Sequence, residues 1–485
     1  MPAGKLVVTK NKVFVFTFFL LYAISFLLLF SRRGLGLYFH PDFKDSFMDL
    51  FNMAASPFNS TYPPFSLIGF KILHLLTHPD IACSSFALKQ NYYGAWFVML
   101  YIFAFSSMFL YIIFFSIRGD NKRKIFYSIL FLFSGIVLWA TERANVMSFA
   151  FLFSLLFAIF YVDGDERKKR LSYVFIALAI SLKLYPGAFL LLLLEKKDFK
   201  GFFLVILETI AIFVFSYAIC QYLDFLIQFE YDLGLMEYMK DIRSYIKVLF
   251  HLAAIFFVFV FSCFVIYEIY RENWRVVKIL GFFSFAAIVF FVAFISLAKK
   301  ENIISFVLNV FKPIMNAIAF GNERAPAVES VSVSAKNLFL LINFLLTGNS
   351  TFSKSGMVVV FKVLCVFLCV FSFVFNERSW KKLASASLLC MYVPDFSGFY
   401  LLIYFIIPLL FFINEKENNK IDYVYACLFA IITTFFIIPF KLEGGIYYNI
   451  ITGSFIVISL CVFLFLMLLF FDAICNVARK GKELK

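Results

Sequence analysis

The chain has 485 residues, of which 63% are hydrophobic and 74 are Phe, and its mean hydropathy is +0.91. Soluble domains contain about 45–50% apolar residues, so this composition excludes a soluble protein and indicates an integral membrane protein. The net charge of +14 resides in short Lys and Arg clusters between apolar runs, which argues against a nucleic-acid partner. Such clusters are typical of topology signals and of contacts with the headgroups of membrane lipids.

Apolar runs long enough to cross a bilayer recur along the whole chain. The first, residues 13–30, follows a basic tip and is not followed by a small-residue cleavage site, so we expect a retained anchor. A helical span needs about 20 apolar residues, whereas a membrane β-barrel needs an alternating pattern that this sequence lacks. The sequence therefore predicts an all-α polytopic protein, with residues 1–485 as a single transmembrane domain.

The basic clusters predict which loops face the cytoplasm, because Lys and Arg are enriched on that side of a membrane. Eight clusters can be cytoplasmic at once, including both termini: the N-terminus, 118–124, 163–170, 195–200, 270–278, 376–382, 414–420 and 478–485. The loops left outside are 31–91, 141–147, 225–247, 298–355 and 439–445. Acidic and aromatic residues mix at helical spacing in the longest of them, which predicts helices lying on the outer membrane surface in 225–247 and 298–355.

Two segments need an even number of crossings to keep these clusters on one side. In 170–195 the first apolar arm has about 12 residues and covers roughly 18 Å, and Pro and Gly then break the helix at 183–187. Residues 383–413 break in the same way at 392–400. We expect two short-helix hairpins whose turns line a polar cavity that opens outward. The alternative, one Pro-kinked span in each place, would put a basic flank on the other side.

Polar residues gather at the predicted outer ends of these segments. Ionisable groups at membrane depth are costly unless they are paired or functional, so several on one side suggest a site. A carboxylate can accept a proton from a hydroxyl, and Arg or Lys can hold a phosphate. Simpler interpretations stay open, namely a local ion pair, a helix cap, a snorkelling lysine or a rigid turn. The candidates are Asp45, Asp49, Tyr62, Glu142, Arg143, Asn145, Lys183, Tyr185 and Asp395.

Three motifs together resemble polyprenyl-phosphate-sugar-dependent glycosyltransferases of the C-type superfold. ERANV (142–146) is followed about 40 residues later by KLYP (183–186), and the first outer loop contains DSFMDLFN (45–52) before TYPPF (61–65). Within the superfold the chain is similar to family 87, which includes bacterial mannosyl- and arabinofuranosyltransferases. The resemblance is clearest over 40–200, and the spacer before Tyr-Pro-Pro is short here. It implies a bundle of about 12–14 helices.

The resemblance also implies roles for individual residues. An acidic residue of the first outer loop acts as catalytic base in such enzymes, and Asp49 fits that place better than Asp45. Arg143 and Lys183 correspond to groups that hold the donor phosphate. The supporting residues would be Glu142, Asn145, Tyr185, Tyr62 and Asp395.

The implied reaction transfers a hexosyl or pentosyl group, with inversion, from a polyprenyl-phosphate sugar to a glycan or glycolipid of the cell envelope. The sequence shows no ligand set that demands a metal, although a divalent cation is compatible with it. Two other functions remain open at this point. One is a lipid-linked sugar flippase or secondary transporter, and the other is a polysaccharide polymerase or ligase.

Overall fold

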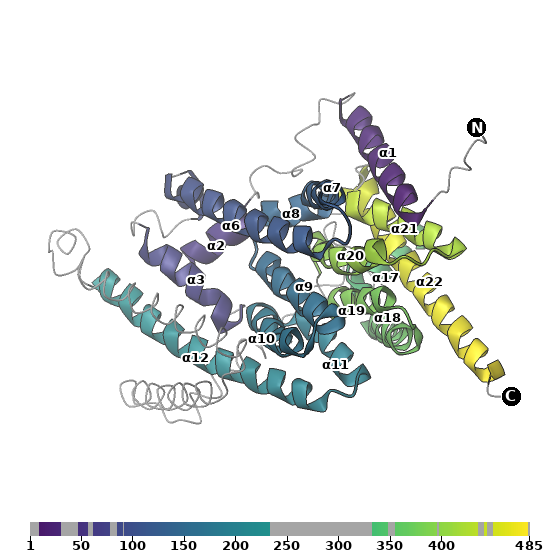
Figure 1. Cartoon of the computed structure of the whole chain (residues 1–485). Helices are drawn as coiled ribbons and strands as arrows, with labels where there is room; N and C mark the ends of the chain where they lie inside the picture. The colour runs from purple at the N-terminus through teal and green to yellow at the C-terminus, as the bar shows by residue number, and fades with distance from the viewer. Residues whose placement is uncertain are drawn as a thin grey trace.

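The computed structural model describes residues 9–30, 47–56, 62–77, 85–90, 92–232, 332–347, 355–394, 397–434, 441–443 and 450–483. These residues form 17 α-helices, two 3-10 helices and one short antiparallel pair of strands, β1 (Lys441–Glu443) and β2 (Ile450–Thr452). The predicted all-helical class is confirmed (Figure 1). The helices outnumber the expected 12–14 because several predicted spans are divided into shorter helices.

The first half of the chain supplies most of the helices that surround the candidate site. These helices are α1 (Lys10–Phe30), α2 (Met48–Ala55), α3 (Pro64–Leu75), α5 (Ser85–Gln90), α6 (Tyr92–Ser116), α7 (Asn121–Leu132), α8 (Gly135–Arg143), α9 (Met147–Asp163), α10 (Glu166–Leu182), η3 (Tyr185–Leu190), α11 (Leu191–Glu195) and α12 (Phe199–Asp232). Because α12 continues to Asp232, the first part of the predicted loop 225–247 is helical. Residues 233–331 lie outside the described residues.

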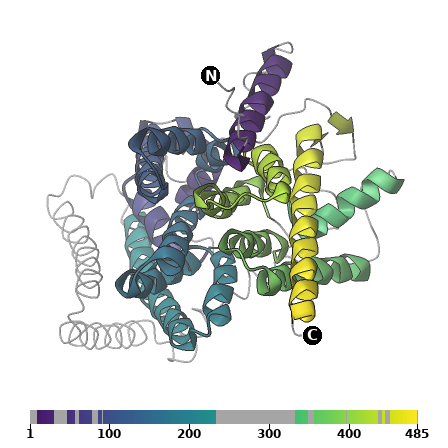
Figure 2. The ribbon, with the colours of Figure 1, turned by 45° about the vertical axis from the view of Figure 1, so that its right-hand side comes forward.

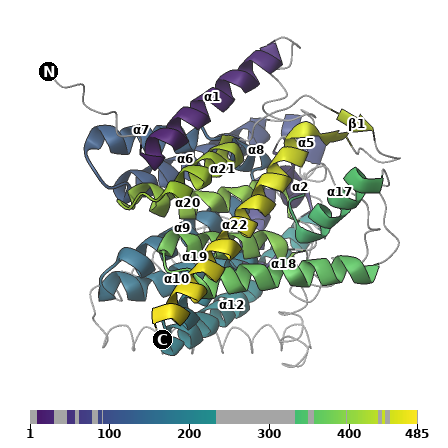
Figure 3. The same ribbon diagram turned by 90° about the vertical axis from the view of Figure 1, so that its right-hand side faces the viewer.

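The second half packs against this group. Its helices are α17 (Ala335–Thr347), α18 (Ser355–Phe375), α19 (Ser379–Tyr392), η5 (Phe399–Phe405), α20 (Ile406–Asn414), α21 (Lys420–Thr434) and α22 (Gly453–Glu483). Helix α22 passes along α18 and α21 (Figure 2), and α1 lies against α21 (Figure 3). Helix α9 packs against α10, and η5 packs against α8. The two halves of the chain therefore meet at η5, next to the candidate site.

Several helices are long and apolar enough to cross a membrane. Within the described part of the chain there are four, at Gly94–Ser116, Phe199–Asp224, Gly356–Phe375 and Ile456–Lys480. Helices α7 and α8 pass the same test together, with a bend of 53° between them. The chain is thus a multi-pass membrane protein, in agreement with the expectation from composition.

Seven of the eight basic clusters meet on one side of the molecule, which we call the basic face. Polar contacts connect them in a chain: Lys10 with Glu415, Arg118 with Asn414 and Asp163, Lys169 with Asp198, Lys382 with Glu195, and Lys480 with Glu377. The eighth cluster, 270–278, lies outside the described residues. The shared side that the charge pattern predicts is therefore found for every cluster that is described.

Both predicted hairpins return to the basic face. Asp198, just after α11, accepts a hydrogen bond from Tyr173 in the first half of α10, with 2.6 Å between the oxygens. Glu415, just after α20, accepts one from Arg378, just before α19, at 3.0 Å. A single kinked span would carry the second flank to the opposite side, so these contacts exclude that alternative for both segments.

The turn of the first hairpin lies far from the basic face. Helices α9 and α10 each have 17 residues, which corresponds to about 25 Å at 1.5 Å per residue. Helix α9 starts beside Asn145 and ends at Asp163 on the basic face, and α10 runs from that face to Lys183. Asn145 and Lys183 therefore share the end of the bundle that lies opposite the basic face.

Candidate active site

Asp49 lies in the first turn of α2, a short helix that is fixed at both ends. Its apolar side, which includes Leu50 and Phe51, is buried, as expected for an amphipathic helix that packs on one face. The amide of Phe47 donates to the carbonyl of Glu142 at 2.7 Å, and the ring Nδ1 of His74 bonds to the carbonyl of Ala54 at 2.7 Å. These contacts hold the aspartate against the end of α8.

Arg143 binds the carboxylate of Asp49 through two nitrogens. Its Nε donates to Oδ2 at 3.2 Å and its Nη2 donates to Oδ1 at 2.6 Å. This paired geometry fixes the plane of the carboxylate as well as its position. The side chains of Arg143 and Asp49 are 23% and 17% exposed, so the pair is accessible from outside. Arg143 thus forms an ion pair with Asp49, a residue distant in sequence, which the interpretation as a local pair with Glu142 did not include.

Asn145 connects this ion pair to two other parts of the site. Its Nδ2 donates to Asp49 Oδ2 at 3.0 Å and to the Tyr62 hydroxyl at 3.1 Å. Its Oδ1 accepts from the amide of Met147, the first residue of α9, at 3.0 Å. The same side chain thus binds the first amide of α9 and orients the carboxylate of Asp49.

A strained turn at Ala144 lets both of its neighbours, Arg143 and Asn145, bind Asp49. Ala144 has φ of 47°, a left-handed conformation that costs a residue with a Cβ roughly 1–2 kcal/mol. The turn ends α8 and lets the residues on both sides of Ala144 face Asp49. Packing around Ala144, which is 1% exposed, stabilises the turn.

Lys183 lies where α10 ends, outside the long spanning helices. The hydroxyl of Ser66 in α3 donates to the last carbonyl of α10, that of Leu182, at 2.5 Å. Beyond it the Lys183 ammonium lies 3.7 Å from the centre of the Tyr62 ring and 6.0 Å from that of Tyr185. Such cation–π contacts stabilise a cation in an enclosed place. Burial lowers the pKa of Lys183 to about 8, although the charge of Asp49 opposes this change.

Tyr400, in η5, joins the same group and was missed by the sequence analysis. It interacts electrostatically with Tyr185, Asp49 and Tyr62. Its ring folds back over Gly398, where a Cβ would overlap the ring atoms. The available signal was its place at the end of the predicted break at 392–400. This break includes the segment PDFSGFY, whose Gly and Tyr are the two residues in contact.

The remaining predicted residues have different outcomes. Glu142 is 7% exposed, and its backbone carbonyl accepts the hydrogen bond from the amide of Phe47. Tyr185 begins η3, faces Lys183, and accepts a hydrogen bond from Cys390 at its carbonyl. Asp45 and Asp395 lie outside the described residues, so their expected roles remain predictions. Among the residues that are described, no three His, Cys, Asp or Glu side chains form a group that fits a metal ion.

Comparison with known protein families matches residues 61–295 to glycosyltransferase family 87. The chain carries a glycosyltransferase family 87 domain over these residues. This membrane glycosyltransferase has Tyr62, Arg143, Asn145 and Lys183 within the matched region, whereas Asp49 precedes it. No curated protein and no solved structure matches the chain.

Proposed function

We propose that this family 87 protein transfers a hexosyl or pentosyl group, with inversion, from a polyprenyl-phosphate sugar to a glycan or glycolipid acceptor of the cell envelope. The observation that carries the proposal is the group formed by Asp49, Arg143, Asn145 and Lys183. It combines an oriented carboxylate with a nearby cation, and these are the two groups that displacement of a phosphate by a hydroxyl requires.

In this mechanism Asp49 is the general base. The acceptor oxygen attacks the anomeric carbon and gives its proton to the Asp49 carboxylate. The bond between the anomeric carbon and the phosphate oxygen breaks at the same time, and the polyprenyl phosphate leaves. Attack from the side opposite the leaving group inverts the anomeric centre. Arg143 and Asn145 position the carboxylate, since both bond to it directly.

Lys183 is the group best placed to stabilise the leaving phosphate. Arg143 already bonds to Asp49, whereas the ammonium of Lys183 makes no ion pair with any residue in the described ranges. Charge-assisted hydrogen bonds to phosphate oxygens are about twice as strong as neutral ones. Tyr62 and Tyr185 keep the ammonium facing the site through their rings.

We assign transfer to the extracytoplasmic side and both termini to the cytoplasm. Lys and Arg are enriched in cytoplasmic loops, so the basic face is the cytoplasmic side in this proposal. The group around Asp49 then opens at the other side, about 25 Å away along α9 and α10.

The test is sugar transfer in membranes that contain equal amounts of the wild type, Asp49→Asn or Lys183→Met. The donors are a panel of radiolabelled polyprenyl-phosphate hexoses and pentoses. Asp163→Asn, which alters an exposed carboxylate on the basic face, is the matched control. We expect Asp49→Asn to abolish measurable transfer and the control to retain it. Undiminished transfer by Asp49→Asn would exclude this aspartate as the base, and labelled lipid that crosses the membrane without any transfer would favour a transporter.

A further inference from the structure

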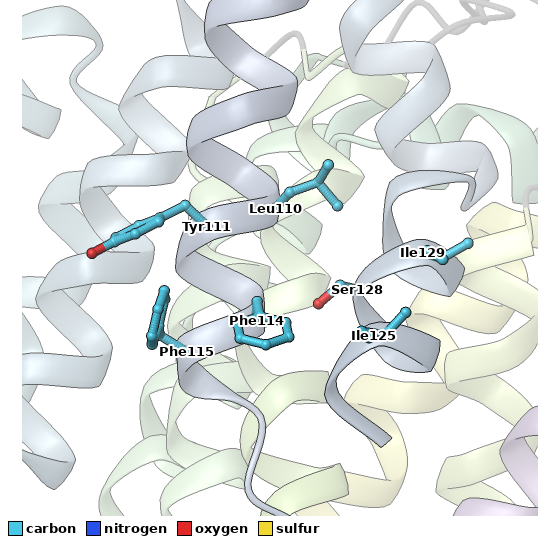
Figure 4. A pocket seen from close by; sticks show the side chains of 7 residues that line it. All are labelled: Leu110, Tyr111, Phe114, Phe115, Ile125, Ser128 and Ile129. Atoms are coloured by element: carbon cyan, nitrogen blue, oxygen red, sulfur yellow. The ribbon is translucent and has the colours of Figure 1, made fainter. Parts of the chain in front are cut away.

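An apolar groove lies between α6 and α7, close to the basic face (Figure 4). It has a volume of about 320 Å³ and is lined by Leu110, Tyr111, Phe114, Phe115, Ile125, Ser128 and Ile129. Tyr111 and Phe115 are 67% and 64% exposed, and Ile125 and Ile129 are each 50% exposed. The groove therefore opens at the exposed side of the helix pair.

One polar group in this groove has no partner within the part of the chain that the structure describes. The side-chain oxygen of Ser128 is buried and makes no hydrogen bond, and the residue is 4% exposed. Some other helical serines, such as Ser116 and Ser154, donate to the carbonyl four residues earlier, whereas Ser128 does not. In Figure 4 the Ser128 hydroxyl points into the space between the two helices. It can therefore bond to an oxygen of a molecule in the groove.

Two lysines at the start of α7, next to the groove-lining part of that helix, have no ion pair within the described residues. Lys122 and Lys124 lie in the first turn of α7, and the described residues provide no ion pair for either of them. Arg118 next to them is neutralised by Asp163, and Arg123 donates to the carbonyl of Ile413. The Lys124 ammonium lies 5.6 Å from the centre of the Phe114 ring, which itself lines the groove. Positive charge and apolar surface are thus continuous.

From this continuity we propose that the α6–α7 groove is a binding site for an anionic phospholipid. One acyl chain occupies the groove, Lys122 and Lys124 bind the phosphate, and Ser128 donates to an ester oxygen of the glycerol region. The lysines, the serine and the apolar lining follow one another in the same order as the headgroup, the glycerol region and the acyl chain of a phospholipid. The charged turn lies at the membrane surface, the polar serine one turn deeper, and the apolar surface beside it. Basic pockets between membrane helices are suited to anionic headgroups.

The groove is distinct from the candidate active site. Tyr101 of α6 bonds to the carbonyl of Asn145 at 3.2 Å, and Phe114 lies about 20 Å farther along the same helix. A donor that presents its phosphate to Lys183 cannot place that phosphate at Lys122 as well. The lipid bound here is therefore a separate ligand that is not consumed by the transfer reaction.

The experiment uses the full-length protein in nanodiscs with phosphatidylglycerol that carries a photoactivatable diazirine on one acyl chain. Crosslinks are mapped by mass spectrometry, and unlabelled phosphatidylglycerol, phosphatidylcholine and polyprenyl phosphate compete in separate samples. We expect crosslinks within 110–115 and 125–129, displaced by phosphatidylglycerol at about tenfold lower concentration than by phosphatidylcholine. Equal displacement by the zwitterionic lipid, or preferential displacement by polyprenyl phosphate, would overturn the proposal.

Two sets of variants test the contribution of the lysine charges and that of the groove separately. Lys122→Ala/Lys124→Ala should lower phosphatidylglycerol crosslinking about 30-fold, the effect expected for two lysines near a membrane surface. Lys168→Ala/Lys416→Ala removes the same charge from exposed positions elsewhere and should leave crosslinking unchanged. Ile129→Trp fills the groove and should abolish crosslinking, whereas Phe126→Trp, on the same helix but outside the lining, should not. Loss of crosslinking in either control variant would show that the site is not this groove.

Discussion

The two bonds between Arg143 and Asp49 predict that Arg143→Lys impairs transfer although the positive charge is kept. Arginine donates to both carboxylate oxygens from one planar group, whereas an ammonium is a point charge on a flexible chain. Lysine would still neutralise Asp49 but would leave the carboxylate free to rotate. If Asp49 is a base whose orientation matters, the variant loses activity for a geometric reason.

The size of the effect follows from the bonds that are lost. A hydrogen bond to a charged group contributes about 1.5–3 kcal/mol, and each 1.36 kcal/mol corresponds to a tenfold change in rate. Loss of one of the two bonds should therefore lower kcat/KM by roughly 10- to 100-fold. The bond from Asn145 to the same carboxylate remains and keeps the loss below that of Asp49→Asn.

The assay is the kinetics of sugar transfer at matched protein levels, with Arg118→Lys as control. Arg118 forms an Arg–Asp pair with Asp163 at 2.8 Å, but the two side chains are 63% and 38% exposed, and such pairs contribute about 0–1 kcal/mol. Less than a threefold change is expected there. A loss below threefold in Arg143→Lys alone would refute this reasoning.

Three further predictions concern the surroundings of this pair. Because the pKa of Lys183 is about 8, its ammonium is lost as pH rises through that value, so transfer should decline between about pH 7 and 9. Lys183→Arg, which stays charged, should remove this decline from the pH–rate profile, and an unchanged profile would contradict the role of Lys183. Tyr400→Leu should lower kcat/KM severalfold while Tyr400→Phe retains most of it, and Gly398→Ala should resemble Tyr400→Leu because the added Cβ displaces the ring. His74→Ala should destabilise the protein by about 1–3 kcal/mol in thermal inactivation, since the carbonyl of Ala54 loses its partner, and wild-type stability would argue against this anchor.

The sequence predicted those features that depend on chain-wide patterns. Apolar runs of sufficient length gave the all-helical membrane class, and Pro and Gly located the break after Lys183. The basic clusters share one face because charged groups avoid the bilayer interior, whichever residues they later contact. Three short motifs indicated the family, and they also indicated most of the residues that gather around Asp49.

Specific pairings were not predictable, because they depend on how helices distant in sequence pack together. The expected role of Arg143 in holding a phosphate stays a prediction, but its bond to Asp49, 94 positions earlier, was not predicted. Nothing local to ERANV specifies the left-handed conformation of Ala144, which turns Asn145 toward the same carboxylate. Tyr400 escaped notice because tyrosine is common in this chain and its position beside Asp49 is created only when η5 packs against α8.

The distribution of polar groups bears on the choice between an enzyme and a carrier. A carrier with alternating access needs a route for its substrate to both sides, with discontinuous helices near the middle of the membrane. Here both helix hairpins start and end at the basic face, and the first one turns beside Lys183. The basic face is closed by contacts that cross between clusters, including Lys382 with Glu195 and Arg378 with Glu415. A site whose described polar groups lie at one end of the bundle, away from the basic face, suits the proposed transferase better than a carrier with alternating access.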